Sequence, residues 1–312
     1  MKKLRKPQPL QPGDVVRVIA PASPLTNGER LANGLATLES WGLRVRMREG
    51  MNDRRHLFFA GRPEERASEL MEALLDPEAK LILPVRGGYG LTTILPMLDA
   101  AAVKAAGPKI VCGCSDLTAL LTWLVQDVGQ TCFHGPMVGA LGERDAAGTE
   151  RLRRLLFDGG KPAELRPASS DAHTFCASPG VATGRAVGGS LSLLAAQCGT
   201  PWQLDATGAI LFLEDVGERP YRIDRMLTQL AQAGLFEQAA GVVFGDFTGC
   251  DEPNGGLGWR DAVDRVFRKL AVPVLLGVPF GHGNPNLAWP LGVRAHLDAG
   301  AGVVTFREAP LA

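Results

Sequence analysis

Short apolar runs alternate with longer amphipathic stretches through the first half of the chain. Apolar or alternating runs predict strands over Val15–Ala20, Leu43–Met47, Leu81–Pro84 and Lys109–Cys112. Apolar residues at helical spacing predict helices over Gly28–Trp41, Glu64–Leu75, Leu91–Leu98 and Asp116–Val128. Strands that alternate with helices are typical of a parallel sheet whose two faces are both covered.

The second half repeats the mixture with more strands. Apolar runs predict strands over Ala182–Val187, Ala209–Leu213, Gly241–Phe244, Val274–Leu276 and Val303–Phe306. Helical spacing predicts helices over Ser190–Ala196, Tyr221–Ala233 and Trp259–Leu270. Between the halves, Asp158–Pro179 is rich in Gly, Pro and Ser. We therefore predict an α/β protein with an N-terminal domain at 1–160, a linker at 161–180 and a C-terminal β/α domain at 181–312.

Composition narrows the function classes. The 312 residues hold 33 Lys and Arg against 33 Asp and Glu, a balance that argues against a nucleic-acid partner. No apolar run is long enough to span a bilayer, and the basic N-terminus continues into polar residues where a signal peptide needs an apolar core. The six cysteines are dispersed without a CxxC pair, so no structural zinc site is predicted. We expect a cytoplasmic protein without membrane contact.

The sharpest local feature is a serine between a predicted strand and a predicted helix. Ser115 follows the strand at Lys109–Cys112 and precedes the helix at once, as the nucleophile does in a strand–turn–helix elbow. Free N–H groups at a helix start would favour a developing oxyanion. The alternative is that Ser115 or Asp116 only caps the helix.

A glycine-rich loop, Arg86-Gly-Gly-Tyr-Gly90, follows the strand at Leu81–Pro84. Consecutive glycines let backbone amides approach a ligand closely, so this loop is a candidate oxyanion or phosphate site. It stands at the same sheet edge as Ser115, because both follow strands of one parallel sheet. Neither a Walker sequence nor a complete GxGxxG accompanies it, and an ordinary turn remains the alternative.

Two further loops carry an acid and a histidine. The predicted strand Ala209–Leu213 ends in Glu214 and Asp215, and a carboxylate there is well placed to orient a histidine. Asp215 and Glu218 fit equally well as charges at the start of the following helix. His282, between two glycines after the strand at Val274–Leu276, is the candidate base.

The main rival histidine is His134, which follows another short apolar run. A structural histidine remains the alternative at each position. Taken together, Ser115, an acid near position 214 and His282 form a Ser-His-Glu set in which each member follows a predicted strand.

With these residues the chain resembles the LD-carboxypeptidases, peptidase family S66, which include muramoyltetrapeptide carboxypeptidases and microcin C immunity peptidases. The matching segments are spread along the chain in the family's order. They are Val18-Ile-Ala-Pro-Ala-Ser-Pro24, Arg86-Gly-Gly-Tyr-Gly90, Gly113-Cys-Ser115-Asp116, Phe133-His-Gly-Pro136, Gly188-Gly-Ser-Leu191, Leu213-Glu214-Asp215 and Gly281-His282. Cys114 stands where the family usually has an aromatic residue.

The resemblance implies roles for individual residues. Ser115 matches the nucleophile, Glu214 the triad acid and His282 the general base, and the backbone N–H groups of Gly88 and Asp116 match the oxyanion hole. Arg86 is our candidate for binding the substrate carboxylate.

The resemblance also implies a fold and a reaction. The fold is a flavodoxin- or class I amidotransferase-like parallel-sheet domain joined to a mixed β/α domain, with the active site between them. The reaction is hydrolysis of the bond before a terminal D-amino acid, which in the muropeptide enzymes releases D-alanine from murein tetrapeptide during cell-wall recycling. A small peptide substrate, a homodimer and no cofactor or metal are expected.

Three alternatives stay open. A microcin C immunity-type peptidase would cleave a peptidyl-adenylate conjugate, for which Trp202 or Trp289 would be stacking candidates. A metal-dependent hydrolase would use Glu214, Asp215, Asp246 and His282 as ligands, without the support of an HExxH motif. A binding module without activity is the third.

Overall fold

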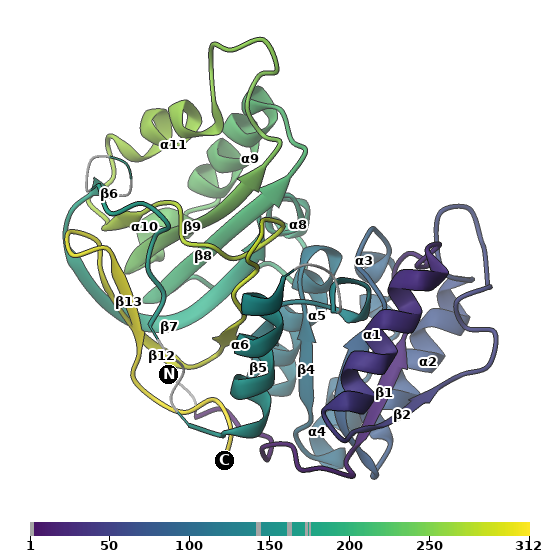
Figure 1. Cartoon of the computed structure of the whole chain (residues 1–312). Helices are drawn as coiled ribbons and strands as arrows, with labels where there is room; N and C mark the ends of the chain where they lie inside the picture. The colour runs from purple at the N-terminus through teal and green to yellow at the C-terminus, as the bar shows by residue number, and fades with distance from the viewer. Residues whose placement is uncertain (1–2, 142–144, 161–163, 172–173, 175) are drawn as a thin grey trace. The chain divides into compact units, whose positions relative to one another are not determined.

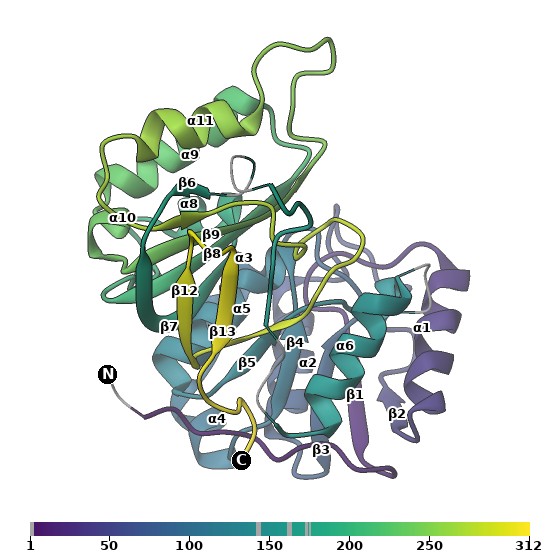
Figure 2. The same cartoon turned by 60° about the vertical axis from the view of Figure 1, so that its left-hand side comes forward.

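The computed structural model describes residues 3–141, 145–160, 164–171, 174 and 176–312. The chain forms two compact units, drawn in Figures 1 and 2. Unit 1 comprises Met1–Gly160 with two short returning segments, Leu287–Pro290 and Pro310–Ala312. Unit 2 comprises Lys161–Asn286 and Leu291–Ala309.

Unit 1 is built on a six-stranded sheet with the order β11-β5-β4-β3-β1-β2. Neighbouring strands from β5 to β2 are parallel. The strands are β1 (Val15–Ile19), β2 (Arg44–Met47), β3 (Ala79–Pro84), β4 (Ile110–Gly113), β5 (Cys132–His134) and β11 (Trp289–Leu291). The order 2-1-3-4-5 is that of flavodoxin-like sheets, which bind ligands at the carboxyl ends of their strands.

Helices cover both faces of this sheet. They are α1 (Gly28–Ser40), α2 (Pro63–Leu75), α3 (Leu91–Ile94), α4 (Ala100–Ala106), α5 (Thr118–Trp123) and α6 (Ala146–Phe157). In Figure 1, α1 and α6 lie in front of the strands and α2 and α4 behind them. A fully buried core joins Leu38 of α1, Leu152 of α6 and strand residues such as Leu83. The helices α1 and α6 therefore bury apolar residues against the sheet.

Unit 2 contains a mixed seven-stranded sheet with the order β13-β12-β7-β8-β9-β10-β6. The four central strands β7 to β10 are parallel, and β12, β13 and β6 are antiparallel to their neighbours. The strands are β6 (Cys176–Ser178), β7 (Val181–Ser190), β8 (Ala209–Val216), β9 (Gly241–Thr248), β10 (Val274–Leu275), β12 (Arg294–Asp298) and β13 (Val303–Phe306).

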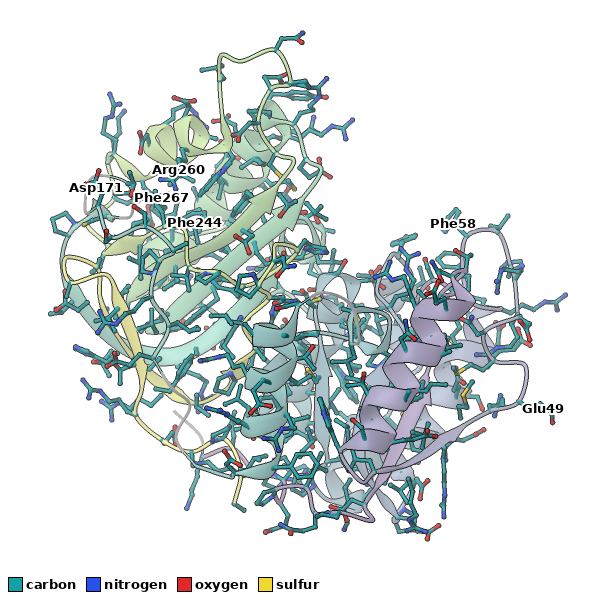
Figure 3. The ribbon with its side chains drawn as sticks, viewed as in Figure 1. Glu49, Phe58, Asp171, Phe244, Arg260 and Phe267 are labelled. Carbon is teal, nitrogen blue, oxygen red and sulfur yellow. The ribbon has the colours of Figure 1, made fainter. Side chains whose placement is uncertain are left out.

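The helices of unit 2 are α8 (Leu191–Gln197), α9 (Pro220–Gln232), α10 (Leu235–Gln238) and α11 (Trp259–Phe267). Aromatic rings fill the space between the sheet and α11, as shown by Phe244 and Phe267, whose ring centroids lie 5.6 Å apart in an edge-on arrangement. Figure 3 labels both residues. This contact packs α11 against β9, the strand that also carries the polar residue Asp246.

The predicted fold class is confirmed, and the differences have local causes. The helix expected over Leu91–Leu98 ends as α-helix at Ile94 and continues as a 3₁₀ turn at Leu95–Met97, because Pro96 has no N–H to donate. Sequence periodicity missed the strands β5, β6, β11 and β12 and the helices α4, α6 and α10. The strands β5, β6 and β11 have three residues each, which is too short to show a period.

The segment expected as a linker, 161–180, supplies β6 to the sheet of unit 2, and Leu165 forms a bridge with Val304. Residues 161–163, 172, 173 and 175 of it lie outside the described residues. Within the described ranges, no helix is both long and apolar enough to cross a membrane.

Candidate active site

Ser115 sits in a strained turn at the carboxyl end of β4. Its φ is 59°, a left-handed value that non-glycine residues rarely adopt, and it opens a 3₁₀ turn that leads into α5. Gly113 permits the turn, because a Cβ there would lie 2.7 Å from Cγ of Leu117. A strained strand-to-helix turn with a serine at its apex is the geometry of a nucleophile elbow. Strain of this kind is concentrated at functional sites.

The glycine-rich loop after β3 lies against this turn. A Cβ on Gly87 would lie 2.9 Å from Cβ of Ser115 and 3.3 Å from the backbone N of Asp116. Gly88 has φ +105°, so a side chain there would be strained and would also meet Ser23. Both positions therefore require glycine, and the expectation that the loop and Ser115 share one sheet edge is confirmed within unit 1.

Two backbone N–H groups beside Ser115 are unused. In the part of the chain that the structure describes, no acceptor takes the N–H of Gly88 or that of Asp116. The Asp116 amide belongs to the first turn of a helical segment, where N–H groups have no partner within the helix. Unused donors next to a serine hydroxyl can stabilise negative charge on a substrate oxygen.

The Asp116 side chain has a different task. It is fully buried, and its Oδ2 accepts the N–H of Leu91 at 2.8 Å. Burial raises the pKa of Asp116 to about 6, while hydrogen bonds from Leu91 and Gly90 and the charge of Arg66 oppose that rise. The carboxylate therefore ties the turn of Ser115 to the start of α3.

Unit 2 brings the predicted acid and base together. Oε2 of Glu214, on β8, lies 2.6 Å from Nδ1 of His282, in the loop after β10. Glu214 is fully buried, whereas the His282 side chain is 22% exposed. An ionised carboxylate can only accept, so it holds the imidazole proton on Nδ1 and leaves Nε2 as an acceptor.

The electrostatics around this pair favour a charged imidazole. Burial lowers the pKa of His282, but the hydrogen bond and charge of Glu214, with the charges of Asp215 and Asp246, outweigh it and raise the pKa above its usual value. Burial and the nearby Glu214 raise the pKa of Asp215, and likewise that of Asp246, to about 6. The site can therefore stabilise an imidazolium formed during a reaction.

The loop that carries His282 is held on two sides. The N–H of Asp246, which lies in an irregular part of β9, donates to the carbonyl of Phe280 at 2.9 Å. The Asn286 side chain accepts the N–H of Gly281 at 3.1 Å. Glycines flank the histidine because a Cβ on Gly281 would lie 2.6 Å from Oε2 of Glu214, and one on Gly283 would lie 2.2 Å from Oδ2 of Asp246. The Gly-His-Gly sequence is thus a packing requirement.

Replacing Gly281 with alanine is expected to lower kcat about a hundredfold, because displacing a catalytic group by about 1 Å has a cost of that order. The new methyl group would push the Glu214 carboxylate away from His282, and φ at this position is +118°. Steady-state kinetics per correctly folded molecule, with the melting temperature measured alongside, would check this. Gly300→Ala is the matched control, since Gly300 is exposed and a Cβ there meets nothing closer than 3.6 Å. An unchanged kcat in Gly281→Ala would contradict the packing argument.

The other residues singled out from sequence fall in varied places. Arg86 is exposed beside Gly88, with its Nη2 3.5 Å from the position of a Gly88 Cβ. His134 is fully buried in unit 1 and stacks on Trp289 at 5.3 Å, so the rival histidine and this tryptophan are core residues. Glu218 lies 3.5 Å from Arg222 in an ion pair.

Trp202 is half-buried in unit 2. Among the residues that the structure describes, no three His, Cys, Asp or Glu side chains are grouped so that they could hold a metal ion. Two oxygens of the metal-ligand alternative are already engaged, because Asp215 accepts the N–H groups of Ser192 and Val216 at 2.7 and 2.8 Å.

Sequence reasoning missed several residues that support these groups. Asn286 and Asp246 hold the His282 loop, and the signal for Asn286 was its place in the glycine- and proline-rich stretch after the histidine. Ser23, Arg66 and Glu69 contact the loops of unit 1. Ser23 lies in the segment Val18–Pro24 that carries the family resemblance, whereas Arg66 and Glu69 had no signal in the sequence.

Comparison with known proteins follows the same division of the chain. Residues 16–135 match the LD-carboxypeptidase N-terminal domain, and residues 183–297 match the LD-carboxypeptidase C-terminal domain. The probable murein peptide carboxypeptidase of Bacillus subtilis is 36% identical over 94% of this chain and 91% of its own length. The Microcin C7 self-immunity protein of Escherichia coli is 26% identical over 93% of this chain and 92% of its own length.

A solved structure of a similar protein has the same fold. The crystal structure of muramoyltetrapeptide carboxypeptidase from Oxalobacter formigenes superposes with a TM-score of 0.81 at 30% sequence identity. The alignment covers 94% of this chain and 97% of that one.

Proposed function

The chain belongs to the LD-carboxypeptidase family, and on that premise we propose that it is a serine carboxypeptidase that releases the terminal D-alanine from murein tetrapeptide. The observation that carries the proposal is the chemistry of two groups of residues, one in each unit. Unit 1 presents a serine in a strained turn beside two unused N–H groups, and unit 2 presents a histidine oriented by a buried glutamate. These are the components that serine-dependent acyl transfer needs.

In the proposed mechanism, His282 takes the proton from Ser115 while Ser115 attacks the carbonyl carbon of the bond before D-alanine. The N–H groups of Gly88 and Asp116 receive the negative oxygen. His282 then donates its proton to the leaving amine, and water hydrolyses the acyl-enzyme with His282 again as base. Glu214 stabilises the imidazolium in both steps. Arg86, exposed beside the loop, is the candidate for the substrate's terminal carboxylate.

The test is D-alanine release from purified murein tetrapeptide, compared with hydrolysis of a peptidyl sulfamoyl adenylate. We expect the tetrapeptide to be the better substrate by kcat/KM. Faster cleavage of the nucleotide conjugate would replace the proposal with the immunity-type alternative. Activity that is lost in EDTA and restored by a divalent metal would instead favour a metal-dependent hydrolase. No hydrolysis and no labelling by a fluorophosphonate would favour a binding module.

The pH dependence of kcat/KM should report His282. A general base must be neutral, so activity is lost as the pH falls through the pKa of His282. That pKa is raised, so we expect the inflection above about 6.5, the ordinary value for histidine. In Glu214→Gln the residual activity should show an inflection at lower pH, because the Glu214 carboxylate is the main group that raises the pKa. An inflection that does not move in this variant would contradict the assignment.

A further inference from the structure

Unit 1 contains a buried polar cluster behind the glycine-rich loop. We propose that Arg66 and Glu69 on α2, together with Ser23, are positioning residues that hold the loop 86–91 so that the Gly88 N–H faces the reacting carbonyl. The inference rests on the proposed function, because it assigns these side chains a task in forming the oxyanion site. None of the three would touch substrate.

Arg66 connects four parts of unit 1. Its side chain is fully buried, and its Nη1 donates to the carbonyls of Pro21 and Gly90 at 2.8 and 2.9 Å. Its Nη2 donates to Oγ1 of Thr93 at 2.9 Å, and its Nε donates to the carbonyl of Gly61 at 3.2 Å. The loops after β1 and β3 are thereby joined through one planar group. Only arginine has enough donors in a fixed fork for such a connection.

A buried cation of this kind is costly to keep. Among the described residues no carboxylate lies within ion-pair distance of Arg66, and burial lowers its pKa despite the charge of Asp116. The cost is offset by hydrogen bonds to the buried carbonyls of Pro21, Gly61 and Gly90, which an apolar side chain would leave without this donor. Arg66 therefore fixes the positions of these backbone groups relative to one another.

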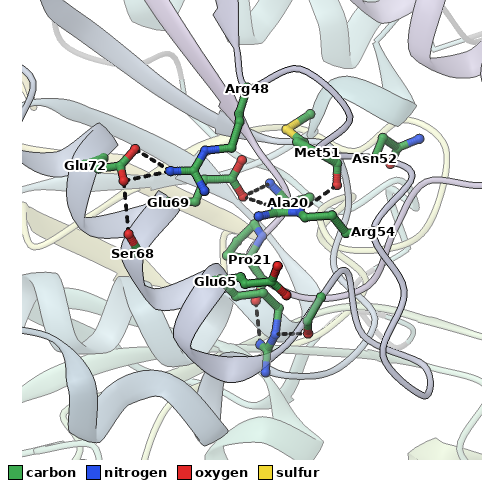
Figure 4. A network of polar contacts seen from close by, with 12 residues as sticks. Ala20, Pro21, Arg48, Met51, Asn52, Arg54, Glu65, Ser68, Glu69 and Glu72 are labelled. Carbon is green, nitrogen blue, oxygen red and sulfur yellow. Dashed lines mark hydrogen bonds and ion pairs between the residues drawn. The ribbon is translucent and has the colours of Figure 1, made fainter.

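Glu69 holds the chain just before Pro21, one turn along α2. Its Oε2 accepts the N–H of Ala20 at 3.2 Å and pairs with Nη2 of Arg54 at 2.6 Å. Figure 4 shows these contacts, with Ala20 and Pro21 side by side at the end of β1. Arg66 and Glu69 together therefore place the start of the segment that contains Ser23.

Ser23 makes the direct contact with the loop. Its N–H donates to the carbonyl of Gly87 at 3.2 Å, and its Oγ accepts the N–H of Tyr89 at 3.2 Å. A Cβ on Gly88 would lie 2.4 Å from this Oγ, so the hydroxyl lies directly behind Gly88.

The loop is held at each residue around Gly88. The Gly87 carbonyl and the Tyr89 N–H are taken by Ser23, the Gly90 carbonyl by Arg66 and the Leu91 N–H by Asp116. The Gly88 N–H is the group left for a ligand. Preorganised donors stabilise a transition state because they need no rearrangement when charge develops. Removing one of these contacts with the loop should therefore weaken transition-state binding more than ground-state binding.

Ser23→Ala tests this directly, with Ser68→Ala as the matched control because Ser68 is on α2 but contacts Glu72 away from the loop. In Ser23→Ala we expect kcat per active site to fall about tenfold, less than the loss from removing an oxyanion donor outright. Affinity for a peptidyl boronic acid, whose Ser115 adduct mimics the tetrahedral intermediate, should fall by a similar factor. KM and affinity for the product tripeptide should stay within about twofold. A purely structural role would lower the melting temperature or the number of active sites titrated by a fluorophosphonate. It would leave kcat per active site and the affinity for the boronic acid at their wild-type values.

Arg66→Lys is the second variant, since it keeps the charge and removes the fork. We expect it to lower kcat and the affinity for the boronic acid at least tenfold, both by a similar factor. Wild-type kcat and boronate affinity in Ser23→Ala would overturn the inference and leave the proposed function standing. If the wild-type protein neither hydrolyses the tetrapeptide nor reacts with a fluorophosphonate, both fall together.

Discussion

Replacing Ser115 with alanine is expected to reduce kcat for tetrapeptide hydrolysis by about 10⁴-fold or more, as loss of the nucleophile does in other serine enzymes. The Ser115 hydroxyl is the group that we propose forms the acyl-enzyme beside the two N–H groups, and alanine removes it. Alanine keeps the strained φ of 59° and removes no buried contact of the core. The melting temperature should therefore stay close to that of the wild type.

D-alanine release by the variant, and its labelling by a fluorophosphonate, would check this expectation. Ser40→Ala is the matched control, because Ser40 lies at the exposed end of α1 and its hydroxyl donates to the carbonyl of Thr37, within the same helix. The control should keep full activity and full labelling. Undiminished hydrolysis by Ser115→Ala would end the serine mechanism.

The second large effect is expected for Glu214→Gln, which should lower kcat by about 10⁴-fold, as the equivalent change does in a Ser-His-Asp triad. The side chains have the same shape, so the contact with Gly281 is preserved. The glutamine amide can donate to Nδ1 of His282, which shifts the imidazole proton to Nε2 and removes the base. Loss of the carboxylate also removes the charge that stabilises the imidazolium.

Glu218→Gln distinguishes this role from a general need for acidic charge. Glu218 is four residues away and pairs with Arg222, not with the histidine. Its substitution should leave kcat within about twofold, as expected for loss of a partly exposed ion pair. A loss of kcat in Glu218→Gln alone would show that the acid assignment is wrong.

The residues around β8 show how far sequence reasoning reaches. An apolar run that ends in acidic residues predicted a strand that ended at Leu213. In the structure β8 continues to Val216, so that Glu214 and Asp215 are both strand residues. Side chains alternate between the two faces of a strand. Glu214 therefore contacts His282, and Asp215 turns to the N–H of Ser192 at the start of α8.

The choice among three nearby acids thus depended on strand register, which pairs Glu214 of β8 with Ser190 of β7. Register is set by contacts with neighbouring strands whose paired residues lie 24 to 32 residues away in the chain, and no local pattern reports it. Position at a strand end favoured Glu214 from sequence, and the resemblance supplied the same residue.

The sequence by itself determined the parts of this protein whose causes are local. Alternating apolar and amphipathic runs predict most of the longer strands and helices, and glycines near Ser115 and His282 mark tight turns because a Cβ would collide there. Only the tertiary structure decided which polar groups meet. Arg66 has no sequence signature, because its partners are backbone carbonyls of Pro21, Gly61 and Gly90, which any residue could supply. The role of a buried side chain depends on the residues that pack around it, and those residues come from distant parts of the chain.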